Sequence, residues 1–306
     1  IVAGSLIGSG IFIVSANITT NVGSAGWLVA VWVITGFMTI TAAVSYGELS
    51  GMFPKAGGQY QYLKEAYNPL IAFLYGWSFF AVIQTGTIAA VGVAFSKFTA
   101  YLIPAVSEDL VWLDLGFVTI SPAQVLAIFT IILLTYINTR GVKSGKIIQS
   151  TLTTVKLVSL FGLIVAGFFM LKPEVWQANW SNAWDMKKLL PDGNIETYIT
   201  IGAFGAIASA MVGSIFSSDA WNNVTFIAGE IKNPQRNIGL SLFLGTLIVT
   251  VIYVSANVMY TGILPLNEIA FAENDRVGVA ASTVIFGAAG TIVIALMIMV
   301  STFGCN

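Results

Sequence analysis

Eight long apolar segments constrain the fold of this chain more than any other feature. They lie near residues 1–21, 26–52, 69–103, 122–138, 145–171, 198–229, 238–263 and 277–306. A helix needs about 20 residues to cross the roughly 30 Å hydrocarbon core of a bilayer, so these segments are candidates for membrane spans. None shows the strict alternation of apolar and polar residues that a membrane β-strand requires. The sequence therefore predicts an all-α polytopic membrane helical bundle of eight helices, forming a single transmembrane domain over residues 1–306.

The scarcity of charge supports a membrane environment. Hydrophobic residues make up 57% of the chain and charged residues only 9%, whereas a soluble domain has about 25% charged residues. A net charge of −1 gives no reason to expect a nucleic-acid partner. The chain has no histidine and one cysteine, Cys305, so we expect no metal site, no cofactor and no intrachain disulfide. Because the chain lacks an initial methionine and begins and stops inside apolar stretches, we expect both ends to be cuts.

The distribution of lysine and arginine predicts the orientation of the helices. The loops after the second, fourth and sixth segments are rich in basic residues, namely Lys55, Lys64, Arg140, Lys143, Lys146, Lys232 and Arg236. The alternate loops carry mostly acidic residues, although residues 172–197 include three lysines. Since positively charged loops stay on the cytoplasmic side, we expect a multi-pass protein of the cell membrane with its N-terminus in the cytoplasm.

Two apolar segments are interrupted by residues that favour an unwound backbone. The first contains Gly8-Ser9-Gly10, and the sixth contains Ser217-Ser218-Asp219 followed by two asparagines. Interrupted helices five segments apart indicate an inverted-repeat transporter with its substrate site at the breaks. The free N–H groups of the following half-helix suit a carboxylate, and the free carbonyls of the preceding half-helix suit an ammonium. An amino acid carries both groups.

Structural explanations for the same residues remain open. Gly4 and Gly8 form a small-xxx-small pair that is typical of close helix packing. Asp219 could cap the half-helix that begins near Ala220, and capping and ligand contact are equally favoured and compatible. Placing an aspartate in the middle of a membrane segment costs about 2.5 to 3.5 kcal/mol, and such residues usually serve function. We therefore interpret the polar break as a binding site.

Lys156 is the second charged residue inside a membrane segment. It lies near the middle of the fifth segment, too far from either end for its ammonium group to reach the headgroups easily. Its neighbours Thr153, Thr154 and Ser159 provide hydroxyl groups but no acidic partner. The ammonium is therefore expected to bind carbonyls or hydroxyls of other helices, and a functional role is favoured.

Several stretches resemble one transporter family. They are GSGIF at 8–12, YGELSGMFPKAGGQYQYLKEAY at 46–67, TTVKL at 153–157, DAWNNVTFIAGEIKNPQRNI at 219–238 and STFG at 301–304. In these the chain resembles the amino acid–polyamine–organocation superfamily, and within it the L-type amino acid transporters with the LeuT-type fold. The resemblance implies a 5+5 inverted repeat with discontinuous first and sixth helices, in which residues 1–171 form the first repeat and 198–306 begin the second. Family members have about twelve helices, so further helices are expected to be missing.

The same resemblance implies how a substrate is held. Ser9 and Gly10 would donate N–H groups to its carboxylate, and the carbonyls of Leu6, Phe216 and Asp219 would accept its ammonium. The Phe216 side chain would act as a gate above the substrate.

Further roles follow from the resemblance at other positions. Asn222 would steady the unwound region. Lys156 would sit where sodium-coupled relatives bind sodium, bridging the first helix to Ser301 of the eighth, which implies sodium-independent transport. Ser217-Ser218 and Ala220 depart from the family pattern, which leaves the size of the pocket open. Residues 103–121 contain no cysteine, so no disulfide-linked heavy subunit is expected.

The resulting hypothesis is sodium-independent secondary transport of amino acids by alternating access, with exchange of neutral L-amino acids. A proton-coupled symporter and an amino acid/polyamine antiporter are the nearest alternatives. An intramembrane enzyme is disfavoured, because the chain has no histidine and no G-x-S-x-G motif. A channel would need polar residues along one continuous pore. A sensor that binds amino acids without moving them is a further alternative, which a measurement of flux would separate from a transporter.

Overall fold

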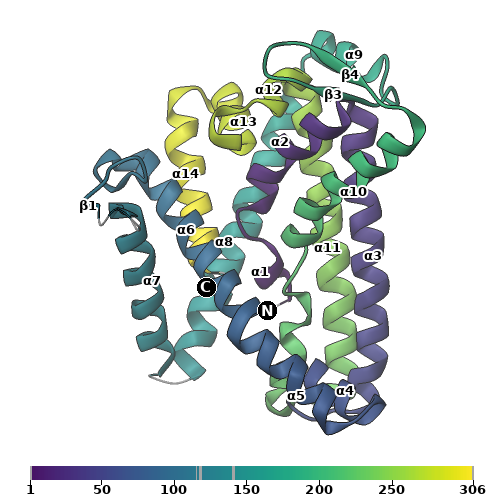
Figure 1. The fold of residues 1–306 in the computed structure, drawn as a ribbon, viewed down its shortest axis with the longest axis vertical. Helices are drawn as coiled ribbons and strands as arrows, with labels where there is room; N and C mark the ends of the chain where they lie inside the picture. The colour runs from purple at the N-terminus through teal and green to yellow at the C-terminus, as the bar shows by residue number, and fades with distance from the viewer. Residues whose placement is uncertain (1, 115, 117–118, 140–141, 305–306) are drawn as a thin grey trace.

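The computed structural model describes residues 2–114, 116, 119–139 and 142–304 of the chain. Most of them are helical (Figure 1). The longer helices are α2 (Gly10–Val22), α3 (Ala25–Met52), α5 (Pro69–Ser78), α6 (Thr85–Leu102), α7 (Pro122–Thr139), α8 (Val142–Phe169), α10 (Thr200–Ser217), α11 (Pro234–Ile263), α13 (Val277–Phe286) and α14 (Ala288–Phe303). Shorter helices are α1 (Val2–Leu6), α4 (Gln59–Ala66), α9 (Pro173–Trp180) and α12 (Leu266–Ala270).

Among the described residues, six helices are long and apolar enough to cross a membrane. They are Ala25–Met52, Pro69–Leu102, Pro122–Thr139, Gln149–Phe169, Ile201–Glu230 and Pro234–Ile263. They correspond to the second to seventh predicted segments, which confirms a polytopic helical membrane protein. Large apolar side chains such as Phe73, Trp77 and Phe169 are exposed on the outer surface of the bundle, as contact with lipid requires.

The first and eighth predicted segments are not single long helices. The 277–306 run is divided at Gly287 (φ 64°, ψ −152°) into α13 and α14. A positive φ of this kind ends a helix at little cost only where the residue is glycine. The first segment is divided into α1 and α2. The expectation of eight spanning helices therefore stays a prediction, with six supported by length.

Both predicted interruptions are present. The first helix ends at Leu6 and resumes at Gly10. The sixth segment ends its α-helix at Ser217 and continues from Trp221 as the 3-10 helix η3 (Trp221–Glu230). Between them Ala220 takes a left-handed conformation with a φ of 65°, which costs about 1–2 kcal/mol in a residue with a Cβ atom. Glycine and serine lower the free-energy cost of unwinding the helix at the first break. At the second break, the backbone of Ala220 is strained.

The core of the bundle lies where α2, α3, α10 and α11 meet. α3 and α11 run side by side along the long axis of the molecule, and α2 packs against α10 (Figure 1). Ile11, Trp32, Leu242 and Tyr253 belong to one buried apolar cluster. This packing holds the two interrupted helices against each other.

The connections lie at two opposite ends of the bundle. At one end β3 (Lys187–Leu189) pairs with β4 (Ile195–Thr197), and α9 and α12 lie close to this hairpin (Figure 1). A second short hairpin, β1 (Leu113–Asp114) with β2 (Thr119–Ile120), lies at the left side of Figure 1 in the connection from α6 to α7. The 3-10 turns η2 (Pro104–Val106) and η4 (Glu273–Asp275) follow α6 and α12 in the chain. At the other end is α4, and the start of α11 lies beside the end of α3 there, with Gln235 close to Gly51. The basic loops around Lys55 and Lys232 therefore lie at the same end of the bundle. This agrees with the prediction that the basic loops share one side of the membrane. Arg140 lies outside the described residues.

Candidate functional site

The two breaks lie against each other at the centre of the bundle. A side chain at Gly10, the first residue of α2, would meet Ser217 at the end of α10, because a Cβ atom there would be 2.6 Å from the Ser217 Cβ. Glycine is therefore required at position 10 for this close approach. The expected role of Gly10 as an N–H donor to substrate stays a prediction, and the packing against Ser217 is a second, structural reason for this residue.

One tyrosine hydroxyl joins the two breaks. Tyr253 Oη of α11 donates to the Leu6 carbonyl at 2.9 Å and lies 3.3 Å from the Ser217 carbonyl. The ring is buried and packs edge-on against Trp32 of α3, with 5.2 Å between ring centroids. Our reading of the sequence missed Tyr253. Its position inside an apolar segment could have indicated a hydrogen-bonding role, because a buried phenol normally has a hydrogen-bond partner.

Lys156 ties the first break to α8 and α14. Its side chain is 3% exposed, and its Nζ donates to the carbonyls of Gly4 at 2.6 Å, Ile7 at 2.9 Å and Ser301 at 3.4 Å. Gly4 belongs to α1, Ile7 lies in the first break and Ser301 belongs to α14. The position agrees with the expected bridge from the first helix to Ser301, while the proposed cation-like role stays a prediction.

The Ser301 hydroxyl completes this cluster. Its Oγ donates to the Ile7 carbonyl at 2.9 Å and lies 3.3 Å from the Gly8 carbonyl. The unwound carbonyls of residues 7 and 8 are thus bound by an ammonium and a hydroxyl, as a buried backbone requires. The positive charge of Lys156 is thus surrounded by the carbonyl oxygens of Gly4, Ile7 and Ser301.

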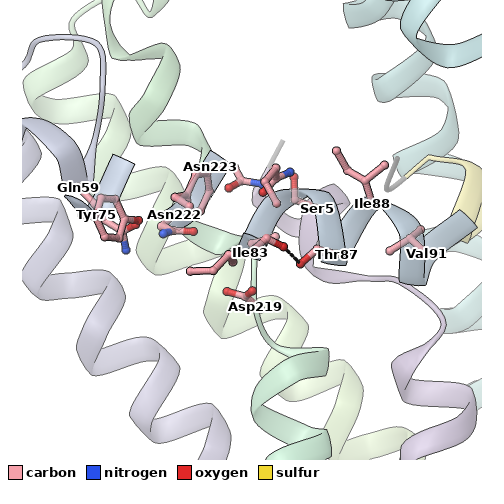
Figure 2. A pocket seen from close by; sticks show the side chains of 13 residues that line it. Ser5, Gln59, Tyr75, Ile83, Thr87, Ile88, Val91, Asp219, Asn222 and Asn223 are labelled. Carbon is pink, nitrogen blue, oxygen red and sulfur yellow. Dashed lines mark hydrogen bonds between the residues drawn. The ribbon is translucent and has the colours of Figure 1, made fainter. Parts of the chain in front are cut away.

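A cavity of about 270 Å³ lies beside the breaks (Figure 2). α1, α4, the α5–α6 helix and the segment between α10 and η3 each contribute to its wall. The lining residues are Ser5, Gln59, Tyr75, Phe79, Ile83, Gln84, Thr87, Ile88, Val91, Asp219, Ala220, Asn222 and Asn223. The wall therefore combines one carboxylate, several amides and hydroxyls, and an apolar stripe from the α5–α6 helix.

Asp219 and Asn222 are the predicted site residues that line this cavity. Within the described residues, the Asp219 carboxylate accepts no hydrogen bond, and the residue before η3, Ala220, has no side-chain cap. The capping role considered for Asp219 is thus absent from this conformation. Its carboxylate is left exposed at the cavity, where it can accept a cationic group. Asn222 is buried, and its carbonyl accepts from the Thr225 hydroxyl at 2.7 Å, which stabilises the turn after the break.

The other predicted substrate contacts, at Leu6, Ser9, Gly10 and Phe216, are not part of the cavity lining. Ser9 precedes α2 as its N-cap and makes no side-chain capping bond. The Leu6 carbonyl accepts from Tyr253 Oη and from the Gly8 N–H at 3.0 Å. The Phe216 carbonyl accepts from the Asp219 N–H at 3.3 Å, and the Phe216 side chain is 55% exposed. In this conformation these carbonyls are engaged within the protein, so their expected contacts with a substrate ammonium stay predictions.

Sequence reasoning missed the wall formed by the α5–α6 helix. Phe79, Ile83 and Gln84 belong to η1 (Phe79–Gln84), a π-helical turn between α5 and α6. A lone glutamine in the middle of an apolar segment was the available signal. A π-turn depends on the tertiary surroundings of a helix and has no reliable signature in one sequence.

The chemistry of the site suits binding of a small zwitterion. The described residues contain no group of three His, Cys, Asp or Glu side chains that could hold a metal ion. The Asp219 carboxylate and several amide and hydroxyl side chains line the cavity instead, and the start of α2 beside the first break is a helix N-terminus, where a negative charge is favoured. This arrangement can recognise an α-amino and an α-carboxyl group.

Comparisons with known proteins agree on one family. The family model described as "Amino acid permease" matches residues 1–306. The chain is 29% identical to the human b(0,+)-type amino acid transporter 1, covering 93% of this chain and 55% of that protein. It is also 29% identical to the human large neutral amino acids transporter small subunit 2, covering 99% of this chain and 52% of that protein. The serine/threonine exchanger SteT of Bacillus subtilis is 29% identical, with 100% of this chain and 62% of that protein covered. The chain thus spans roughly half to three fifths of the length of these relatives.

Proposed function

The chain belongs to the amino acid permease family, and from this premise we propose that it performs sodium-independent exchange of neutral L-amino acids across the cell membrane. The observation that carries the proposal is the cavity beside two interrupted helices, with the Asp219 carboxylate facing it. Relatives named as amino acid transporters, one of them an exchanger, support the same activity. We infer transport and not enzymatic catalysis.

The proposed architecture is a LeuT-type 5+5 inverted repeat. Residues 1–171 would form the first repeat and residues 198–306 the start of the second, with α1–α2 and α10–η3 as the equivalent discontinuous helices. Their contact at Gly10 and Ser217 supports a site near the middle of the membrane. Alternating access would then be a movement of these broken helices against the α3–α11 pair.

Sodium independence rests on the position of Lys156. Backbone carbonyl oxygens, the kind of ligand that can hold a monovalent cation, surround the Lys156 ammonium. A permanently attached positive charge would replace an exchangeable ion at this place. Uptake would then need no sodium gradient.

We propose separate contacts for the ammonium and the carboxylate of an amino acid substrate. Its ammonium would meet Asp219 and the carbonyls of Leu6 and Phe216, once these carbonyls exchange their internal partners for the substrate. Its carboxylate would meet the N–H groups of Ser9 and Gly10, at the start of α2, where the helix dipole favours a negative charge.

Orientation and assembly are also proposals. The basic loops at the α4 end support a cytoplasmic N-terminus. Residues 103–121 contain no cysteine. We therefore propose that no disulfide bond joins this transporter to a heavy subunit. One relative is named as a small subunit, so copurification of the expressed protein would test for a partner.

Reconstitution of the complete gene product in proteoliposomes tests the function. Vesicles loaded with unlabelled amino acids should take up labelled alanine or leucine without sodium and without a pH gradient. Uptake into empty vesicles driven by a pH gradient would indicate a proton symporter instead. Preferred uptake of labelled arginine or a polyamine would point to a cationic substrate held by Asp219. Binding of amino acids without uptake of any label would indicate a sensor.

A further inference from the structure

The π-helical turn η1 places an unusual set of side chains on the cavity wall. Phe79 and Gln84 both line the cavity, although they are five residues apart. Between them, Phe80 and Val82 face outwards and are 72% and 69% exposed. The cavity is thus lined by the first and the last residue of the π-turn, together with Ile83.

This arrangement depends on the wider turn. An α-helix advances about 100° per residue, so residues five apart would point about 140° away from each other. A π-turn, with its i→i+5 hydrogen bonding, brings residue i+5 back over residue i. The wide turn therefore aligns Phe79 with the cavity-lining face of α6, which continues from Gln84 to Thr87, Ile88 and Val91.

Neighbouring threonines help to satisfy the backbone of this turn. Thr85 Oγ1 donates to the Ala81 carbonyl at 2.8 Å, and Thr87 Oγ1 donates to the Ile83 carbonyl at 2.9 Å (Figure 2 shows the second bond). Both hydroxyl protons are used in these bonds. Thr87 lines the cavity but cannot donate to a ligand without releasing the Ile83 carbonyl.

Gln84 is different, because its amide is available. Within the described residues, the Gln84 side chain is half-buried, faces the cavity and makes no hydrogen bond. An amide offers a donor and an acceptor together. A partly buried amide without a partner loses hydration that a ligand can replace. Its neighbour Ile83 supplies an apolar surface for the carbon chain of the same ligand.

We propose that the π-turn makes Gln84 a specificity-determining residue, which selects neutral amino acids with a hydroxyl or carboxamide side chain over aliphatic ones. The inference rests on the proposed function and names its substrate class. A hydroxyl group can pair with one end of the Gln84 amide, and a carboxamide can pair with both. An aliphatic side chain would leave the amide without a partner in the occupied cavity, which lowers the affinity for that substrate.

The test compares substrate preference in wild type, Gln84→Leu and the control Val82→Ala. Labelled exchange in proteoliposomes is competed with serine, glutamine and leucine, and binding is followed in parallel as the ligand-induced rise in Tm in detergent. One hydrogen bond to a partly solvated amide corresponds to about a 3- to 10-fold change in affinity. The preference for serine or glutamine over leucine should fall by that factor in Gln84→Leu. Val82→Ala alters the same turn at a side chain that faces outwards, is 69% exposed and does not line the cavity, so it should leave the preference unchanged.

The outcomes separate this inference from the proposed function. Exchange with the same preference in wild type and Gln84→Leu would overturn the role of Gln84 and leave the exchanger intact. Binding with a shifted preference but without flux would support Gln84 and overturn transport. Neither binding nor flux in wild type would overturn both. Should Gln84→Leu fail to fold, Gln84→Ala removes the same amide with less added apolar volume and must show the same shift.

Discussion

Replacing Lys156 by alanine tests the most specific polar contact in the bundle. The ammonium makes two short hydrogen bonds, to the Gly4 and Ile7 carbonyls at 2.6 and 2.9 Å, and a longer one to Ser301. A hydrogen bond to a charged group contributes about 1.5–3 kcal/mol, so the two short bonds together represent about 3–6 kcal/mol. Burial of the ammonium itself costs several kcal/mol, which offsets much of this attraction. We therefore expect the free energy of unfolding to fall by about 2 kcal/mol or less.

The effect on transport should be larger than the effect on stability. The bonds from Lys156 connect the first break to α8 and α14, and a free-energy change of 1.4 kcal/mol already alters a conformational equilibrium tenfold. We expect Lys156→Ala to reduce the rate of exchange at least about tenfold while the protein remains folded. The rate is measured as labelled amino acid exchange in proteoliposomes, and folding is followed by size-exclusion profile and Tm.

The matched control is Lys97→Ala. Lys97 forms an exposed salt bridge with Glu108 at 3.2 Å, which is worth at most about 1 kcal/mol. Its loss should leave exchange unchanged. The exchange assay is also run in two buffers, one with choline and one with sodium as the main cation. Recovery of exchange by Lys156→Ala in the sodium buffer alone would show that a monovalent cation can occupy the position of the Lys156 ammonium. A folded Lys156→Ala protein that exchanges at the wild-type rate would refute the reasoning.

Two further predictions concern the junction between the breaks. Tyr253→Phe removes the hydroxyl that contacts Leu6 and Ser217, so we expect the free energy of unfolding to fall by about 1 kcal/mol and exchange to slow several-fold; an unchanged rate would show that the two breaks do not need this link. Ala220→Gly relieves a left-handed backbone that costs about 1–2 kcal/mol, less an added entropy cost of about 0.5–1 kcal/mol. The net result should be about 0.5–1 kcal/mol of added stability, read as a higher Tm, and a lower Tm would contradict the strain assigned to Ala220.

Local features of the sequence predicted the interrupted helices correctly. Gly8-Ser9-Gly10 and Ser217-Ser218-Asp219 contain residues that weaken a helix or form hydrogen bonds with nearby backbone groups. Such effects act between near neighbours and can be read from a single sequence. The division at Gly287 was missed because apolar residues continue on both sides of it, and a single glycine is compatible with either a kink or a straight helix.

The candidate site was predicted in part. Asp219 and Asn222 line the cavity. Polar residues within an apolar segment were expected to mark such a site. Gln84 and Gln59 also line it, but nothing in their immediate neighbours indicated that the α5–α6 helix and α4 face the second break. The roles expected for Ser9, Gly10 and Phe216 remain predictions that exchange measurements can test.

The sequence by itself determined that this chain enters a membrane, which segments form its long helices and where two of them break. Those properties follow from the length of apolar runs and from local backbone preference. Only the tertiary structure decided which groups meet at the breaks: Lys156 with the carbonyls of Gly4 and Ile7, and Tyr253 with those of Leu6 and Ser217. The pair Tyr253–Ser217 is 36 positions apart. The other partners are separated by about 150 to 250 positions in the chain. Their meeting depends on how whole helices pack, because no local rule specifies which buried carbonyl a distant side chain will reach.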